Sequence, residues 1–320
     1  MSVAISTWNR ARLVGRAIRS ALSQTFEDFE LLVVDDGSTD ATPEVLAGLT
    51  DPRLRRVRHE RNEGISRTRN TAIALARGEW MAFLDDDNEW APHYLERQLA
   101  LAASRPEAAV VYCRVQARSA GREVIEPDPI WQGHVFRHLV EGWTPFMSGA
   151  LIRLSALIDV GGLDETLRAT EDRDLFMRLA QRTVFAGMAD VLMTKHMRHG
   201  PQLSFNTALQ AADAATADRK WRDIITALAG GKAYRRWRLR QIMYVERCRA
   251  GDAVAAGVGR RSIAAGSAAR LVRFLPWSAP NVLEALGVAI LGPVRGEWVS
   301  RHLSWYTYRA CKALGLRVSR

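Results

Sequence analysis

The first 85 residues alternate between short apolar runs and segments with helical periodicity. Apolar runs typical of buried strands cover residues 3–6, 29–34 and 80–84, and residues 54–58 are a further candidate strand. Between them, apolar side chains recur at the spacing of one helical face over residues 12–23, 42–49 and 66–76. Strands that alternate with helices in this way favour a largely parallel sheet with helices packed on it. The pattern predicts the α/β class, with a Rossmann-like, mostly parallel sheet flanked by helices.

Two of the predicted strands run directly into acidic clusters. Asp35 and Asp36 follow the second strand, and Asp85, Asp86 and Asp87 follow the fourth. Ligands of such sheets bind beyond the carboxyl ends of the strands, so chemistry is expected there. Adjacent acids repel one another, and a divalent cation that bridges to phosphate would relieve this repulsion. A solvated turn that caps the next helix explains the same residues, so these acids alone leave both interpretations open.

A third acidic pair, Glu171 and Asp172, precedes an apolar helical pattern over residues 175–179. Acids at the first turn of a helix interact favourably with its dipole, which is a structural explanation for the pair. A carboxylate near a metal–phosphate site could instead remove a proton from an incoming hydroxyl group. The helix pattern therefore predicts that these acids lie at the start of a helix. Whether they only stabilise the helix or also act as a general base stays open.

Six motifs, in order along the chain, resemble those of the family 2 glycosyltransferases with the A-type nucleotide-sugar-binding fold. They occupy residues 6–10, 35–40, 62–70, 83–90, 161–175 and 198–204. Each motif is common by itself, but six in this order over about residues 3 to 205 are specific. The resemblance implies the glycosyltransferase A-type fold. It also implies an inverting transfer of a sugar from a nucleotide-sugar donor to an acceptor hydroxyl.

The resemblance implies a donor-binding role for residues of the first three motifs. Thr7 and Asn9 lie at the strand end that binds the nucleotide. Asp36 contacts the base, with Asp35 beside it, and Arg69 approaches the nucleotide or its diphosphate. The family uses mainly UDP-sugars and sometimes dTDP- or GDP-sugars, so UDP is the expected nucleotide.

The resemblance also implies a metal-dependent reaction, with Mn²⁺ or Mg²⁺ as the cofactor. Asp85 holds the ribose or sugar side, Asp86 belongs to the same donor-binding set, and Asp87 ligates the metal. His199 is a further candidate ligand, with His196 as the competing histidine and an ordinary surface histidine as the alternative. The ligand assignment among the three adjacent acids rests on the resemblance alone.

The remaining implied residues serve the acceptor. Asp172 is the expected general base, and Glu171 shapes acceptor binding. Trp143 and Ser148 lie between the metal motif and the base, and are candidates for an acceptor or donor-sugar wall. Trp143 fits a core position equally, so its role stays open. One departure from the family pattern concerns Asn88, which stands where a further Asp is frequent.

Charge is distributed unevenly along the chain. Residues 219–320 hold 20 Lys and Arg against 5 Asp and Glu, a net charge of +15, whereas the whole chain carries +10. Such asymmetry indicates two regions with different partners. We expect a catalytic domain over residues 1–205, followed by a mainly helical, basic C-terminal region over 206–320. Helical patterns cover residues 208–252, 260–274 and 299–314.

Three interpretations of the basic region compete. Arginines mixed with aromatic residues over 232–240 are typical of a surface that lies on an anionic membrane. The same composition occurs in nucleic-acid-binding faces, but no nucleic-acid partner is expected here. A helical domain that packs on the catalytic domain or on a second copy of the chain is the third interpretation. A glycosyltransferase whose acceptor is lipid-linked would benefit from the first interpretation, a surface that lies on the membrane.

Apolar patterning and cysteine content indicate where in the cell the protein is located. No secretory signal and no run of about 18 apolar residues is visible. Three separated cysteines, Cys113, Cys248 and Cys311, favour a reducing compartment. The expected location is the cytoplasm or the inner face of the cell membrane.

The competing hypothesis for the function is a non-catalytic nucleotide-sugar-binding or scaffolding protein. The intact Asp87 and Asp172 argue against it.

Overall fold

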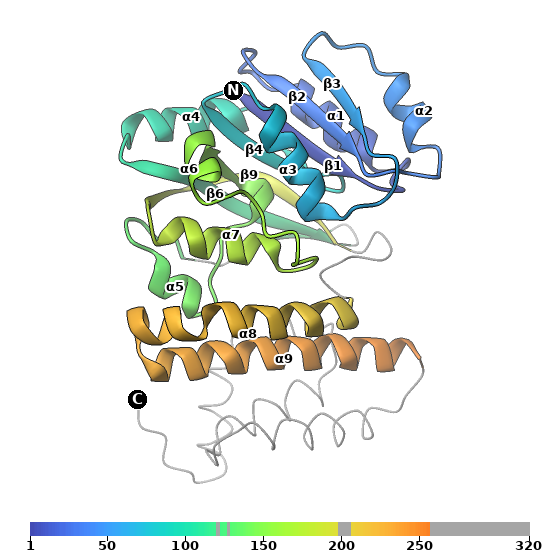
Figure 1. Cartoon of the computed structure of the whole chain (residues 1–320). Coiled ribbons are helices and arrows are strands. Elements are labelled where there is room, and N and C mark those ends of the chain that lie inside the picture. The colour runs from blue at the N-terminus through green and yellow to red at the C-terminus, as the bar shows by residue number, and fades with distance from the viewer. Residues whose placement is uncertain (120–121, 127–128, 198–205, 257–320) are drawn as a thin grey trace. The chain divides into compact units, whose positions relative to one another are not determined.

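A computed structural model describes residues 1–119, 122–126, 129–197 and 206–256 (Figure 1). The chain divides into two compact units, Met1–Pro201 and Gln202–Arg320. The first unit contains a mixed sheet with strand order β3-β2-β1-β4-β8-β6-β9-β5, and β7 pairs with β6 outside this path. The motifs that indicate chemistry, apart from the one over 198–204, all fall in the described part of the first unit.

The parallel half of the sheet is the one that the strand–helix rhythm predicts. Its strands are β1 (Ser2–Thr7), β2 (Glu30–Asp35), β3 (Leu54–Arg58) and β4 (Trp80–Asp85). β1 lies between β2 and β4 and pairs in parallel with both, while β3 pairs with β2. The middle residues of β1, β2 and β4 are apolar and buried, as expected for strands covered on both faces. The predicted α/β class is confirmed.

The second half of the sheet is largely antiparallel. It contains β5 (Glu89–Trp90), β6 (Ala108–Ser119), β7 (Arg122–Ile125), β8 (Ala150–Arg153) and β9 (Val184–His196). β8 runs antiparallel to both β4 and β6, and so joins the two halves. β6 and β9 pair in parallel, with three shifts of register along their length. Such bulges bend strands and re-aim side chains, which suits the part of a sheet that lines a pocket.

Helices pack on both faces of this sheet. The helical elements are α1 (Val14–Leu22), α2 (Thr42–Ala47), α3 (Ile65–Leu75), α4 (Tyr94–Ser104), α5 (Phe136–Val140), η1 (Met147–Gly149), α6 (Leu154–Asp159) and α7 (Glu171–Ala180). Val3 and Ile5 of β1 share a buried cluster with residues of α1 and α4. In Figure 1, α3, α6 and α7 lie in front of the sheet. This second layer brings α3 and α7 to the carboxyl ends of the parallel strands.

The described part of the second unit is a pair of long helices, α8 (Thr207–Ala229) and α9 (Gly231–Ala255). The Asn206 side chain caps α8 by accepting a hydrogen bond from the Leu209 N–H at 3.1 Å. Gly230, with a φ of 89°, makes the turn between the helices. The helices predicted over 208–252 are therefore confirmed, whereas those predicted over 260–274 and 299–314 lie outside the described residues.

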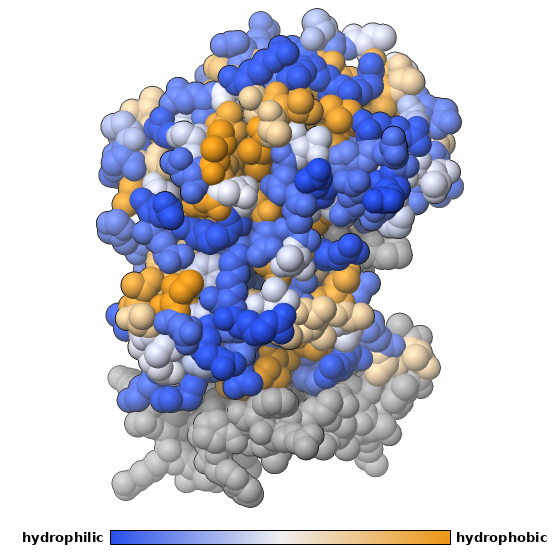
Figure 2. All heavy atoms as spheres, viewed as in Figure 1, coloured by the Kyte–Doolittle hydropathy of each residue, from blue (hydrophilic) through white to orange (hydrophobic). Residues whose placement is uncertain are grey.

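The face of the helix pair seen in Figure 2 carries many polar residues. Figure 2 shows hydrophilic residues along this pair, with scattered hydrophobic ones between them. Asp218 of α8 accepts hydrogen bonds from Arg222 and from the Tyr234 hydroxyl of α9, at 2.7 and 2.6 Å. In the part of the chain that the structure describes, no helix combines the length and the apolar character that a membrane span requires.

Candidate donor and acceptor site

The acidic strand ends meet at one edge of the sheet. β1 lies between β2 and β4, with Thr7 opposite Asp35 and Ser6 opposite Asp85 in the register. Residues that are far apart in the sequence therefore become neighbours, because parallel strands place their carboxyl ends side by side. Thr7 shows the closeness directly, since its hydroxyl group donates a hydrogen bond of 2.7 Å to the Asp86 carboxylate.

Arg69 of α3 lies at the centre of the acidic cluster. Its Nη1 atom contacts the Glu171 carboxylate at 2.6 Å, and its Nη2 atom contacts Asp85 at 2.8 Å. The guanidinium carbon also lies 5.9 Å from the centre of the Phe83 ring. Burial alone would lower the pKa of Arg69, but Asp85, Glu171 and Asp172 together raise it. A permanent positive charge thus joins α3, α7 and the end of β4.

Glu171 and Asp172 occupy the first turn of α7, where the sequence predicts them. Glu171 is buried, and this burial raises its pKa to about 7, with Asp172 adding to the rise and Arg69 opposing it. The Asp172 side chain is half-buried, and its Oδ1 atom accepts a hydrogen bond of 2.6 Å from the Arg173 N–H. The two neighbours therefore differ: Glu171 is held against Arg69, while Asp172 keeps access to solvent.

Ser148 and Asn88 contact Oδ2 of the Asp85 carboxylate, whereas Arg69 contacts Oδ1. The Ser148 hydroxyl donates to Asp85 Oδ2 at 2.8 Å and accepts from the Asp85 N–H at 3.0 Å. The Asn88 side-chain amide donates to the same oxygen at 3.2 Å. An Asp in place of Asn88 would offer no donor here, which gives a physical reason for the departure from the family pattern. Ser148 is predicted to line the acceptor or donor-sugar site, and in the structure it contacts Asp85, which is predicted to bind the donor.

Asp86 and Asp87 complete the acidic end of β4. Burial raises the pKa of Asp86 to about 7, helped by Asp87 and Asp85, while the hydrogen bond from Thr7 and the charge of Arg10 oppose the rise. Arg16 of α1 donates a 2.6 Å hydrogen bond to the backbone carbonyl of Asp87. The three acids thus crowd together in a partly buried place, and a cation would offset their repulsion.

Asp36 holds the segment before α3 in place through hydrogen bonds. Its two carboxylate oxygens accept hydrogen bonds of 2.9 Å from the N–H groups of Glu63 and Gly64, and Oδ1 also lies 2.8 Å from His59 Nδ1. Asp35 is buried beside it, and its Oδ1 accepts from the Ser38 N–H at 3.0 Å. These contacts link the end of β2 to the helix that carries the arginine of the cluster.

Asn9 joins the loops that follow β1 and β2. Its Oδ1 atom accepts hydrogen bonds from the N–H groups of Thr39 and Asp40, at 2.8 and 3.3 Å, and its own N–H donates to Ser38 Oγ at 2.9 Å. Asn9 has a φ of 54°, a left-handed conformation that Asn tolerates better than most residues. The loop geometry therefore gives a local reason for an asparagine here.

The residues present fit a divalent cation in part. Asp85, Asp86 and Asp87 supply the hard carboxylate oxygens that Mg²⁺ and Mn²⁺ prefer. Among the residues that the structure describes, no three His, Cys, Asp or Glu side chains converge as a ready-made ligand set. The His196 Nε2 atom contacts the Glu89 carboxylate, and burial lowers the pKa of His196. His199 lies outside the described residues.

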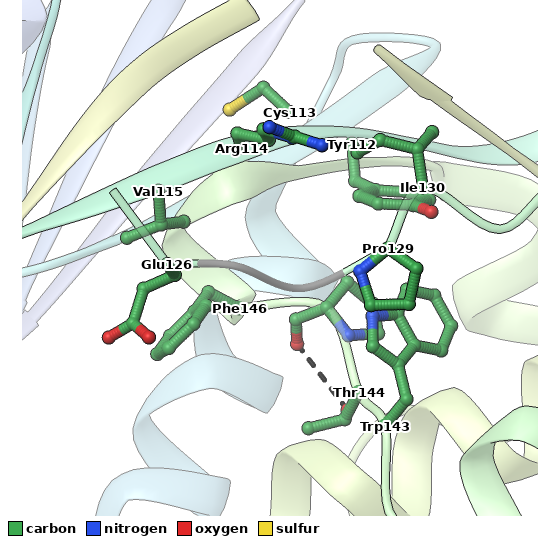
Figure 3. Close-up of a pocket in the computed structure, with 11 residues that line it drawn as sticks. Tyr112, Cys113, Arg114, Val115, Glu126, Pro129, Ile130, Trp143, Thr144 and Phe146 are labelled. Carbon is green, nitrogen blue, oxygen red and sulfur yellow. Dashed lines mark hydrogen bonds between the residues drawn. The ribbon is translucent and has the colours of Figure 1, made fainter. Parts of the chain in front are cut away.

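Trp143 lines a pocket beside β6, which we name the β6 pocket (Figure 3). Tyr112 and Arg114 of β6 form one side of it, Trp143 and Phe146 from the loop between α5 and η1 form the other, and Glu126 lies at its edge. The rings of Tyr112 and Trp143 lie 5.3 Å apart at 56°. Trp143 is half-buried and lines this pocket.

Sequence reasoning missed several supporting residues. Asn88 was visible only as a departure, and Arg16 and His59 carried no signal because their partners are distant in the sequence. Arg114 lies in a strand whose pattern is interrupted by shifts of register. The predicted strand ends locate the acidic residues. The hydrogen bonds and ion pairs from distant residues that hold these acids are seen only in the tertiary structure.

The comparison with protein families agrees with this geometry. The sequence model described as Glycosyl transferase family 2 matches residues 2–161, half of the chain. The chain belongs to glycosyl transferase family 2. Among its relatives, succinoglycan biosynthesis protein ExoO of Rhizobium meliloti is 43% identical over 98 residues, which are 31% of this chain and 28% of ExoO. The matches span less than two thirds of the length of the first curated relatives.

Solved structures show the fold of this family 2 chain at greater length. The complex of S. aureus TarS 1-349 with UDP-GlcNAc matches with a TM-score of 0.56 and 17% identity, over 94% of this chain and 91% of that one. Mannosyltransferase PcManGT from Pyrobaculum calidifontis, in complex with GDP-Man and Mn²⁺, matches with a TM-score of 0.56 and 19% identity, over 93% and 86%. At these identities the likeness concerns the fold.

Proposed function

We propose that this chain is a metal-dependent, inverting glycosyltransferase. It moves a sugar from a nucleotide sugar, most simply a UDP-sugar, to a hydroxyl group of a glycan or lipid-linked acceptor. The observation that carries the proposal is the Arg69 cluster, where one buried cation contacts Glu171 at 2.6 Å and Asp85 at 2.8 Å. This pairing brings the base-bearing helix α7 to the acidic end of β4.

Each residue of the cluster has a distinct task in this reaction. Asp172, half-buried and close to Arg69, removes the proton from the acceptor hydroxyl as its oxygen attacks the anomeric carbon. Glu171 holds the first turn of α7 against Arg69 and so fixes where Asp172 lies. Arg69 places positive charge where the departing nucleoside diphosphate develops negative charge. Thr7 and Asp36 position the strand ends that receive the nucleotide.

A divalent cation belongs to this proposal as the cofactor. Asp87 would hold it, with Asp85 and Asp86 beside it, and the cation would neutralise charge on the leaving diphosphate. Burial raises the pKa of Asp86 to about 7 and the neighbouring Asp87 and Asp85 add to the rise, so a cation beside these side chains would stabilise their charged forms. The Mn²⁺ complex of PcManGT supports a metal in a chain of similar fold.

The nature of the donor and of the pathway has weaker support. TarS is named with UDP-GlcNAc and PcManGT with GDP-Man, so both bases occur in similar folds. ExoO is named for succinoglycan biosynthesis, which supports a role in surface polysaccharide or glycolipid synthesis. The basic region after residue 205 would bring the enzyme to an anionic membrane or pair it with a second copy.

The test is calorimetric titration of the full chain with UDP, GDP and dTDP, each with and without Mn²⁺. We expect one nucleotide to bind more tightly with Mn²⁺. Asp87→Ala should remove the gain from Mn²⁺ but leave the metal-free affinity in place. Asp159→Asn, an exposed acid on α6, serves as the control. Binding without any metal effect in the parent chain would refute the metal dependence.

The same titration separates catalysis from the scaffolding alternative. A non-catalytic nucleotide-sugar-binding protein would bind a nucleotide sugar but leave it intact over hours. An enzyme of this class would release nucleoside diphosphate from the same donor, at least by slow transfer to water. Absence of binding to all three nucleotides would count against both.

A further inference from the structure

His59 lies directly after β3, at the same edge of the sheet as the acidic strand ends. β3 ends at Arg58, and the His59 N–H donates a 2.9 Å hydrogen bond to the backbone carbonyl of Asp35, where β2 ends. The His59 side chain is 11% exposed, and the Asp36 side chain that it contacts is 5% exposed. An imidazole ring buried to this extent needs a hydrogen-bond partner for each of its nitrogen atoms.

Both ring nitrogens of His59 have such a partner. Nδ1 lies 2.8 Å from Asp36 Oδ1, and Nε2 lies 2.9 Å from the Thr71 hydroxyl of α3. A carboxylate can only accept, so the hydrogen between His59 and Asp36 sits on Nδ1. The Thr71 hydroxyl can donate to Nε2 or accept from it, and it also lies 3.1 Å from the carbonyl oxygen of Arg67. Thr71 therefore helps to fix the ring in the orientation that presents an N–H group to Asp36.

Three donors from the described residues converge on the Asp36 carboxylate. Oδ1 accepts from His59 and from the Glu63 N–H, at 2.8 and 2.9 Å, and Oδ2 accepts from the Gly64 N–H at 2.9 Å. An ionised carboxylate has about four acceptor positions. Among the described residues no other donor reaches Oδ2, so this oxygen has one position left for a ligand. His59 thus orients an acid that can still accept a hydrogen bond.

We infer that His59 is a positioning residue for recognition of the nucleotide base. It holds the Asp36 carboxylate so that Oδ2 accepts a hydrogen bond from a ring N–H of the base. A binding group is kept in its productive orientation by hydrogen bonds from the residues behind it. The inference rests on the proposed function, because it concerns the donor site of that same enzyme.

A carboxylate held in this way discriminates between bases. Uracil, thymine and guanine each carry a ring N–H on their pairing edge, whereas cytosine has an unprotonated nitrogen at that place. Asp36 can accept from the first three bases but can only face the lone pair of cytosine. A site built around such a hydrogen bond discriminates strongly against the analogue that lacks it. CDP is therefore the matched probe for UDP, GDP and dTDP.

The test is calorimetric titration of the full chain, in the presence of Mn²⁺, with UDP, GDP, dTDP, CDP and inorganic pyrophosphate. Pyrophosphate lacks a base, so it reports on the part of the donor site that His59 does not affect. We expect the parent chain to bind at least one of UDP, GDP and dTDP about tenfold more tightly than CDP, because hydrogen bonds to charged groups are the stronger ones.

Two amide variants of His59 place their donor at different positions. Asparagine carries its amide nitrogen at the δ position, as histidine carries Nδ1, and so keeps a donor toward Asp36. Glutamine carries it at the ε position, toward Thr71. His59→Gln should lower the affinity for the preferred nucleotide about tenfold, while pyrophosphate affinity stays within about twofold. His59→Asn should bind that nucleotide within about threefold of the parent chain. His93→Gln, at an exposed histidine just before α4, is the control and should change neither affinity.

The outcomes separate this inference from the proposed function. If the parent chain binds none of the nucleotides, the proposed donor chemistry fails and the inference fails with it. If the parent chain binds a nucleotide and His59→Gln binds it equally well, only the inference is overturned. Equal losses of nucleotide and pyrophosphate affinity would show a general structural role for His59 and would also overturn it.

A second pair of variants applies if His59→Gln does not fold. Thr71→Val removes the hydroxyl that contacts Nε2, whereas Thr71→Ser keeps it. We expect Thr71→Val to lower the affinity for the preferred nucleotide about threefold, with pyrophosphate affinity and the serine variant unchanged. Equal nucleotide affinity in the valine and serine variants would overturn the inference.

Discussion

Arg69 and Glu171 form a buried ion pair, 2.6 Å between Nη1 and Oε1, that joins helix α3 to helix α7. The second arm of the same guanidinium contacts Asp85 at the end of β4. One side chain therefore sets the position of the helix with the expected base relative to the strand with the expected metal acids. Its loss should disturb stability and function together.

Arg69→Met is expected to destabilise the first unit by about 3–5 kcal/mol, because it leaves the buried Glu171 carboxylate without its partner. The double variant Arg69→Met with Glu171→Leu should recover part of this loss, since it removes both charges. Urea unfolding of the full chain measures the difference. A loss below about 1 kcal/mol in the single variant would show that the pair contributes no more than a surface salt bridge.

The pH dependence of stability tests the environment of Glu171. Its pKa rises from 4.5 to about 7 in the folded chain, through burial and Asp172 against Arg69. A folded acid with a raised pKa binds its proton more tightly than the unfolded chain does. Its contribution to stability is therefore present below about pH 4.5 and is lost as the pH rises toward 7.

Glu171→Gln removes this titration. We expect the melting temperature of the parent chain to fall relative to this variant between pH 5 and pH 7, and the difference to level off above pH 7.5. Measurements are made without metal or nucleotide, at constant ionic strength. Parallel curves for the two proteins over this range would contradict the raised pKa.

The sequence predicts the parallel half of the fold and most of the acids, because local signals determine both. Alternating periodicity places β1 to β4, and acids directly after a strand must lie at its carboxyl end. β6, β8 and β9 were not predicted, since their pairing depends on antiparallel neighbours and shifted register. The partners of Arg69 lie 16 and 102 residues away, so no local pattern reveals them.

Roles within the site are harder to predict than positions. Ser148 and Asp85 exchange hydrogen bonds across 63 residues, and this contact gives the serine a task that its sequence context does not show. Asp36 is similar, because its carboxylate holds backbone N–H groups of the segment before α3. A motif indicates that a side chain is important. Only its contacts in the folded chain show which group it holds or binds.

Asp172→Asn is expected to lower turnover by about 10²–10⁴-fold while nucleotide affinity stays within twofold, because an amide cannot take up the hydroxyl proton. Nucleoside diphosphate release from the donor that binds gives the rate, and calorimetry gives the affinity. Asp159→Asn, exposed on the neighbouring α6, is the matched control and should behave as the parent chain. A normal rate in Asp172→Asn would remove this residue from the role of base.

Gly37 fixes the turn between the Asp35–Asp36 pair and the cap of α2. Its φ is +71°, and a Cβ atom there would lie 2.5 Å from the backbone carbonyl carbon of Arg61. Gly133 has a φ of +79° but no atom within 4 Å of the same position. Alanine at either site therefore carries the left-handed penalty of about 1–2 kcal/mol, and only Gly37→Ala adds a clash.

We expect Gly37→Ala to lower the unfolding free energy by clearly more than Gly133→Ala, because the backbone of Arg61 must move. The shift should also reach Asp36 and loosen its hold on the segment before α3, so nucleotide affinity should fall in this variant alone. Urea unfolding and nucleotide calorimetry on both variants measure the two effects. Equal losses of stability would mean that the turn relaxes freely, and the tight packing of this loop would then not position the donor site.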